Sequence, residues 1–77
     1  MRRLSDLEVG EKAIIHDILD SGLKQKLLEM GCIPGEKIQV IRQAPFNGPI
    51  AVLISSYTLS IRRNDAQKIS TKAIDNE

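Results

Sequence analysis

Apolar and polar residues alternate one by one through much of the second half of this chain, and this period of two is the strongest constraint on its fold. Three alternating runs follow one another, with apolar positions at Ile38 and Val40, at Ile50, Val52 and Ile54, and at Tyr57, Leu59 and Ile61. Successive side chains of a strand point to opposite faces of a sheet, so each run predicts a strand with one buried face. The sequence therefore predicts three successive strands.

One short helix is predicted before these strands, over residues 22–30. Asp20 or Ser21 can accept a hydrogen bond from the free amides of its first turn. Gly31 can adopt the left-handed conformation that commonly ends a helix. The helix is thus bounded at both ends by residues suited to the position.

The predicted helix has one apolar face. Leu23, Leu27 and Met30 recur at the spacing that places side chains on the same side of a helix. Leu28 falls well off that stripe, because each residue advances by about 100° around the axis. We expect Leu28 either to lie under a neighbouring loop or to be exposed to a partner.

Two further strands and a loop complete the expected set of elements. Residues 12–19 are mixed and β-branched, which favours a strand, and a last strand is expected near residues 68–73. Two of the alternating runs are joined by a loop at residues 44–48. A shorter connection is disfavoured because Pro49 lacks the amide that would close a two-residue turn over Asn47-Gly48. Pro49 is acceptable as the first residue of the following strand.

The length of 77 residues suits one small domain over residues 1–77, because a chain this short buries too little surface to form two cores. Apolar residues make up 42% of the chain, yet Phe46 and Tyr57 are its only aromatics, so the core must be aliphatic. Five short strands with one inserted helix suggest a mainly β fold, a small antiparallel barrel. The helix would cover one open end, and residues 74–77 are expected to fray.

Charge and cysteine content disfavour several classes of protein. The 11 basic and 10 acidic side chains leave a net charge of +1, too small to attract nucleic acid or an anionic membrane strongly. The single cysteine cannot form a disulfide within the chain. No segment has the apolar core of a secretory signal or the ~20 apolar residues that span a bilayer. We expect a cytoplasmic protein without membrane insertion.

Residues 25–69 carry several short motifs in a fixed order. They are Leu27-Leu28 and Gly31 at the helix end, Pro34-Gly35 in a predicted type II turn, Ala44-Pro45, Gly48-Pro49-Ile50, and Leu59 to Arg63 followed by Ala66. With the opening "LSDLEVGEKAIIHDI", they resemble the FeoA family, the small cytoplasmic components of bacterial ferrous iron transport. The resemblance extends over essentially the whole chain.

This resemblance implies an SH3-like barrel that acts as an adaptor for FeoB, the membrane iron permease with a cytoplasmic GTP-binding domain. The same domain occurs in iron-dependent repressors, so a nucleic-acid-binding or regulatory barrel and a metal sensor are the alternatives. A homo-oligomer is also kept open. Two positions depart from the family pattern: Asn47-Gly48-Pro49 stands where many members have Gly-Asp-Pro, and Ser56-Tyr57 where Gly-Tyr is common.

Cys32 and His16 are the only candidate metal ligands that draw notice. A stable site usually needs three or four ligands, and Cys32 has no second cysteine, so burial as a small hydrophobic residue is the simpler interpretation. His16 and Asp17 are expected on opposite faces of a strand, which leaves His16 exposed. No nucleophile with an adjacent base, carboxylate pair or phosphate-binding loop is present, so we expect neither an enzyme nor a bound cofactor.

Apolar side chains that a short helix and a loop cannot easily bury suggest a partner-binding patch. Leu28, Phe46 and Cys32 are the apolar candidates, although they could instead close the ends of the barrel. The predicted partner-binding residues are Lys24, Leu28, Arg42, Phe46, Arg62 and Arg63. The cationic cluster around Arg62 and Arg63 lacks neighbouring aromatic stacking platforms, so it favours a protein partner over nucleic acid.

Overall fold

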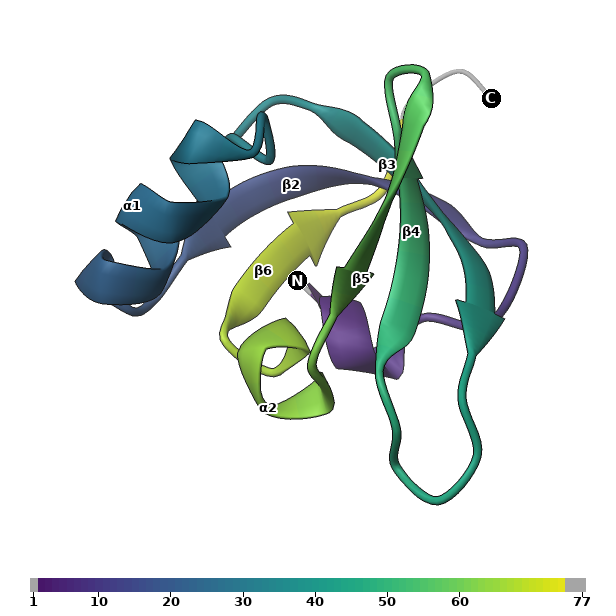
Figure 1. The fold of residues 1–77 in the computed structure, drawn as a ribbon. Helices are drawn as coiled ribbons and strands as arrows, with labels where there is room; N and C mark the ends of the chain where they lie inside the picture. The colour runs from purple at the N-terminus through teal and green to yellow at the C-terminus, as the bar shows by residue number, and fades with distance from the viewer. Residues whose placement is uncertain (1, 75–77) are drawn as a thin grey trace.

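The computed structural model describes residues 2–74, in which one curled sheet carries an inserted helix after its second strand (Figure 1). The elements in chain order are β1 (Arg2–Arg3), η1 (Leu4–Asp6), β2 (Lys12–Ile18), α1 (Ser21–Glu29), β3 (Lys37–Gln43), β4 (Ile50–Ile54), β5 (Tyr57–Ile61), α2 (Arg63–Ala66) and β6 (Ile69–Lys72). The strand order is β1-β6-β2-β3-β4-β5, and all neighbours are antiparallel. The predicted mainly β fold is confirmed, with one strand more than expected.

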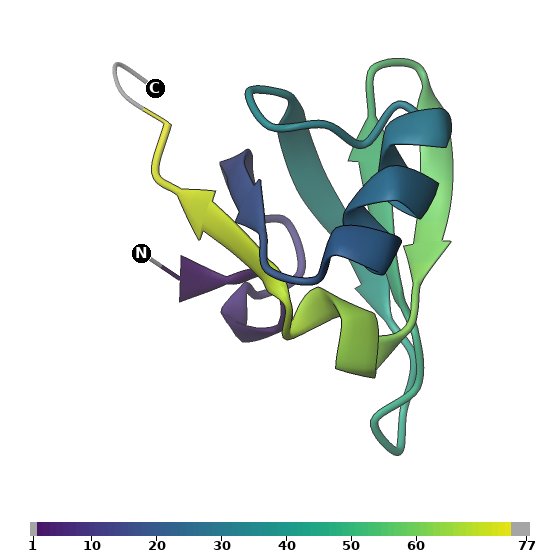
Figure 2. The ribbon, with the colours of Figure 1, turned by 90° about the vertical axis from the view of Figure 1, so that its left-hand side faces the viewer.

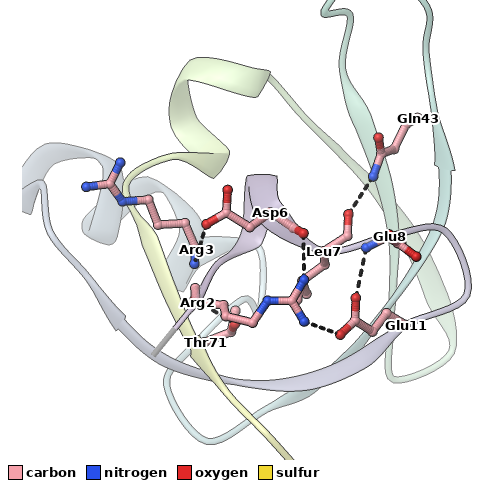
Figure 3. A network of polar contacts seen from close by, with 8 residues as sticks. All are labelled: Arg2, Arg3, Asp6, Leu7, Glu8, Glu11, Gln43 and Thr71. Atoms are coloured by element: carbon pink, nitrogen blue, oxygen red, sulfur yellow. Dashed lines mark hydrogen bonds and ion pairs between the residues drawn. The ribbon is translucent and has the colours of Figure 1, made fainter.

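The additional strand is β1, whose two residues pair with β6. Arg2 lies opposite Thr71 and Arg3 opposite Ser70, and the Thr71 hydroxyl donates a hydrogen bond of 2.8 Å to the Arg2 carbonyl (Figure 3). Both β1 side chains are charged and exposed. Because two arginines carry no apolar alternation, the sequence pattern gave no sign of this strand.

Side-chain contacts fix the N-terminal segment against the sheet (Figure 3). The Arg2 guanidinium donates one hydrogen bond to the Glu11 carboxylate and another, 2.7 Å long, to the Asp6 carbonyl. The Glu8 amide donates to the other Glu11 oxygen at 2.9 Å. Since these two donors favour the charged carboxylate, the backbone N–H of Glu8 and then Arg2 lower the pKa of Glu11.

The ends of α1 form as the sequence predicted. The Asp20 carboxylate accepts a hydrogen bond of 2.9 Å from the Leu23 amide, so Asp20 rather than Ser21 is the N-cap. At the other end, Gly31 has a φ of +82°, and the Cys32 amide donates to the Leu27 carbonyl at 2.9 Å. This pattern is a Schellman motif, in which a left-handed glycine lets the chain turn back and satisfy the last carbonyls.

The prediction that Met30 lies on the buried face of the helix is wrong. Leu23 and Leu27 are buried, but the Met30 side chain is 39% exposed. The helix ends at Glu29, and Met30 is its C-cap with φ −95° and ψ 4°. Because the backbone of Met30 is no longer α-helical, the i, i+7 spacing does not place its side chain on the buried face.

The sheet encloses an aliphatic core. Its apolar members are Leu4, Leu7, Ala13, Ile15, Ile18, Leu23, Leu27, Cys32, Ile38, Val40, Ile50, Val52, Ile54, Ile61, Ala66 and Ile69. β-Bulges interrupt the register between Ile15 and Asp17 and between Val40 and Arg42. α1 lies across the opening between β2 and β5, where the helix was expected to cover the barrel (Figure 2). Ile74 follows β6 without regular structure, and the predicted fraying beyond it lies outside the described residues.

Candidate partner-binding site

The predicted partner-binding residues fall in two separate regions. Lys24 and Leu28 are on α1, whereas Phe46 is in the loop between β3 and β4, which extends from the opposite end of the molecule (Figure 1). Arg62 and Arg63 lie beside that loop, and Arg42 precedes it on β3. The structure therefore does not unite the six residues in one patch, and the loop region holds four of them.

The β3–β4 loop is a tight turn with an aromatic residue at its tip. Phe46 and Asn47 both have a φ of +59°, and the Gly48 amide donates to the Pro45 carbonyl at 3.1 Å. These values describe a turn of the I′ kind, one residue earlier than the Asn47-Gly48 turn that Pro49 forbids. Below it, the Ala44 amide donates to the Pro49 carbonyl at 3.0 Å, so Pro49 precedes β4 instead of opening it.

In this turn Phe46 has a left-handed backbone conformation and a fully exposed side chain. Its side chain is 99% exposed, and a left-handed φ is a genuine outlier for a bulky residue. The interpretation that Phe46 closes a barrel end is therefore wrong. Strained and exposed residues concentrate at functional sites, and an exposed aromatic ring is a typical anchor of a protein interface. Phe46 thus remains a candidate contact for a partner.

Positive charge lies next to the tip of the loop. A shallow hollow of about 220 Å³ lies between the loop and the start of α2, lined by Asn47, Gly48, Pro49, Arg62, Arg63 and Asn64. The Arg63 Nε atom is buried and has no hydrogen-bond partner in the described part of the chain. We call Phe46, Arg62 and Arg63 the loop-tip site.

The α1 residues have different surroundings. Lys24 forms an ion pair of 3.6 Å with Asp17, which partly neutralises its charge. Leu28 is 41% exposed, in agreement with its place off the buried stripe. Two exposed residues that the sequence patterns assigned to buried faces, Met30 and Tyr57, meet nearby, where the Tyr57 hydroxyl donates a hydrogen bond to the Met30 carbonyl. Their exposure depends on the end of α1 and the curl of the sheet, which no local pattern encodes.

Cys32 belongs to the core and not to any docking patch. It is 1% exposed, and burial, followed by the nearby charge of Glu36, raises its pKa to about 11. The structural interpretation of Cys32 is confirmed, and its place among the exposed apolar candidates is wrong. His16 is exposed within the β2 bulge. Within residues 2–74 no three His, Cys, Asp or Glu side chains come together in a group that could hold a metal ion.

No helix in the described part of the chain is long and apolar enough to cross a membrane. The curled antiparallel sheet, the helix inserted after β2 and the single turn of α2 before the last strand define a small SH3-like domain. Its most distinctive surface is a strained aromatic tip with adjacent arginines.

Comparison with known proteins places this SH3-like domain in one family. The FeoA domain model matches residues 2–73, and the chain belongs to the FeoA family. A crystal structure of an iron uptake regulatory protein, FeoA, is 33% identical and covers 91% of this chain and 92% of that one, with a TM-score of 0.80. The Stenotrophomonas maltophilia FeoA complexed with zinc, described as a prokaryotic SH3 domain protein, has a TM-score of 0.80 over 94% of this chain and 91% of that one; at 19% identity it bears on the fold alone.

A curated relative contains this domain as part of a larger chain. The Fe(2+) transport protein A/Fe(2+) transporter FeoB fusion protein of Porphyromonas gingivalis is 38% identical over 73 residues. The match covers 94% of this chain but only 9% of that protein. In that bacterium a domain similar to this chain is therefore joined covalently to a ferrous iron transporter.

Proposed function

We propose that this chain is a non-catalytic adaptor of bacterial ferrous iron uptake, which binds the cytoplasmic, GTP-binding region of a FeoB-type permease. The observation that carries the proposal is the fusion of a 38% identical domain to FeoB in P. gingivalis. Fusion converts association into an intramolecular event and raises the effective concentration of the two parts. A separate chain of the same family must recognise the permease through its own surface.

The loop-tip site is the surface that we assign to this recognition. Phe46 supplies an exposed aromatic ring, and Arg62 and Arg63 supply cations beside it. Aromatic residues and arginine are enriched at interfaces and dominate their binding energy. The matching surface of the permease would therefore combine an apolar pocket with carboxylates.

Regulation through this site requires a difference in affinity between states of the permease. A ligand shifts an equilibrium only as far as it binds one state more tightly than the other. If the adaptor acts on the GTP cycle, its affinity must differ between the nucleotide-free and nucleotide-bound permease. Equal affinities would restrict it to an assembly role.

The test is a binding titration with the soluble cytoplasmic region of a FeoB-type permease, with and without nucleotide. We expect Phe46→Ala to raise the Kd about tenfold or more, as for an interface anchor. Val9→Ala is the matched control, because Val9 is an exposed apolar side chain on the turn before β2 and does not line the hollow beside the tip. Absence of binding by the unaltered chain in every nucleotide state would refute the function, whereas equal loss in both variants would refute the assignment of the site.

A further inference from the structure

Within residues 2–74 the outer edge of β5 has no paired strand, and β5 lacks the charge, proline and bulge that commonly protect a strand edge. β5 ends the strand order, with β4 on one side and no strand pairing on the other among the described residues. Its sequence, Tyr-Thr-Leu-Ser-Ile, contains no charge and no proline, and its register with β4 has no bulge. Natural edge strands are usually protected by a charged side chain, a proline or a bulge, or they are very short.

The opposite edge of the same sheet follows the rule that β5 breaks. β1 has two residues, both arginines and both exposed. A short, charged edge resists pairing with another chain. The two edges of the sheet therefore differ: charge protects β1, whereas β5 carries none.

The pairing with β4 identifies which backbone groups of β5 face outward. Ile54 and Tyr57 close a two-residue hairpin, so this pair exchanges both ladder hydrogen bonds. Hydrogen-bonded and non-hydrogen-bonded pairs alternate along an antiparallel ladder, which makes Leu59 bonded and leaves Thr58 and Ser60 unbonded to β4. The N–H and C=O groups of Thr58 and Ser60 therefore point away from the sheet, ready for another strand.

A groove runs beside this edge, between α1, β5 and α2. Its hollow of about 100 Å³ is lined on the α1 side by Leu23, Leu27 and Met30 and on the β5 side by Leu59 and Ser60. Three of the seven large apolar side chains that the described residues expose, Leu28, Met30 and Tyr57, are on α1, at its end or on β5. An extended segment that paired with β5 would point every second side chain toward α1, and one aliphatic side chain could fill the hollow.

The charges around the groove indicate which charge a bound segment would carry. Lys26 and Arg62 line it, and neither forms an ion pair with a described residue, while Asp65 is the one acidic lining residue. A segment with a carboxylate next to its aliphatic residue would match the two cations. Recognition of a polyproline segment is disfavoured, because such grooves are lined by several aromatic rings and the chain has only Phe46 and Tyr57.

We propose that the β5 edge binds an extended acidic segment of the permease by strand addition, with one aliphatic side chain of the segment between α1 and β5. In this binding mode main-chain hydrogen bonds provide affinity and side-chain pockets provide specificity. The inference rests on the proposed adaptor function, and it adds a second contact region to the loop-tip site. Arg62 adjoins both regions, so one bound partner can reach both.

The first test is amide hydrogen exchange of the full chain with and without the soluble cytoplasmic region of the permease. The amides of Thr58 and Ser60 should exchange about tenfold more slowly or better in the complex, because they gain hydrogen-bond acceptors. The Leu59 amide, already bonded to Val52 across the ladder, should change much less. Equal protection of all three amides, or none, would contradict strand addition.

The second test removes one outward amide. Ser60→Pro deletes an N–H that β4 does not use, a position where an edge strand tolerates proline, and should raise the Kd about tenfold or more. Ser60→Thr keeps the N–H and is the matched control, with an expected change of less than about twofold. Lys26→Glu should also weaken binding if the segment is acidic.

The outcomes separate this inference from the proposed function. If the unaltered chain binds the permease region but Ser60→Pro binds equally well, the edge is not the contact and the adaptor function stands. If the unaltered chain does not bind, the adaptor function and this occupant both fail. If Ser60→Pro instead abolishes a concentration-dependent dimer of the chain alone, the edge pairs with a second copy and the acidic segment is the wrong occupant. Should Ser60→Pro fail to fold, the exchange data decide.

Discussion

Gly31 satisfies two constraints that no other residue type can satisfy together. Its φ of +82° is left-handed, and a Cβ there would lie 2.5 Å from the Tyr57 hydroxyl. That hydroxyl donates to the Met30 carbonyl, so Tyr57 could make room only by breaking its own hydrogen bond. The glycine thus permits both the end of α1 and the contact that ties α1 to β5.

We predict that Gly31→Ala destabilises the protein by about 2 kcal/mol or more, against about 1 kcal/mol for Gly10→Ala. Gly10 is the matched control because its φ of +92° is equally left-handed but a Cβ there meets nothing within 4 Å. Urea unfolding of both variants measures the difference. In a Tyr57→Phe background the extra cost at Gly31 should largely disappear, and its persistence there would mean that the close approach is not the cause.

Burial lowers the reactivity of the Cys32 thiol, because it raises the pKa of that group. The thiolate is the reactive form, and the pKa of about 11 keeps it a small minority at neutral pH. We predict that a thiol reagent at pH 8 modifies the native chain at least about a hundredfold more slowly than the urea-unfolded chain. Modification at the same rate in both states would contradict the burial of Cys32, and Cys32→Ser controls for reaction at other groups.

Among the elements, the β3–β4 loop is the one whose sequence opposes its own conformation. Phe46 occupies a left-handed position that Gly or Asn would adopt at little cost, and its side chain gains no internal contact in return. Sequences are usually consistent between local preference and fold except at functional sites. The conflict at Phe46 is the structural reason for assigning a binding role to the tip.

We predict that Phe46→Asn stabilises the free protein by about 0.5–1 kcal/mol and weakens binding to the permease region. Thermal unfolding and the binding titration measure the two effects on one variant. The matched control is Asn47→Gly, which relaxes the neighbouring left-handed residue but keeps the aromatic ring and should retain binding. A variant at Phe46 that loses stability would show that the ring makes contacts which the fold needs.

Local sequence patterns predicted some of the helices and strands and missed others. α1, β3, β4 and β5 were predicted because caps and alternation are local signals, and Gly31 ended the helix as expected. β1 was missed because its pairing with β6 joins the two ends of the chain. The separation of Leu28 from Phe46, the exposure of Met30 and the open edge of β5 depend on how the sheet curls, which is set by contacts between distant segments.

At the scale of the whole molecule, the N-terminal segment closes the fold through charged groups. β1 pairs with β6, and Arg2 bridges the Glu11 carboxylate and the Asp6 carbonyl (Figure 3). The Gln43 side chain donates to the Leu7 carbonyl at 2.6 Å, which ties the same segment to β3. The N-terminal segment is therefore joined to β6, to β3 and to Glu11 just before β2, by contacts that depend in part on a carboxylate.

This dependence makes global stability sensitive to acid. The pKa of Glu11 in the folded chain is below its ordinary value of 4.5, so the unfolded chain binds a proton first as the pH falls. The stabilisation is complete above about pH 4.5 and is lost as the pH falls through the folded pKa. Asp20 adds to the same trend, because the Leu23 amide, and to a smaller extent Lys68, lowers its pKa.

We predict that the free energy of unfolding, measured by urea titration from pH 7 to pH 3, declines less steeply in Glu11→Gln than in the unaltered chain. Glu11→Gln should also be less stable at pH 7, because a neutral amide cannot pair with Arg2 as the carboxylate does. Asp20 keeps part of the acid dependence in that variant, and Asp20→Asn with Glu11→Gln should flatten it further. If Glu11→Gln retains the full slope, the carboxylate that receives Arg2 does not couple the N-terminal segment to the stability of the fold.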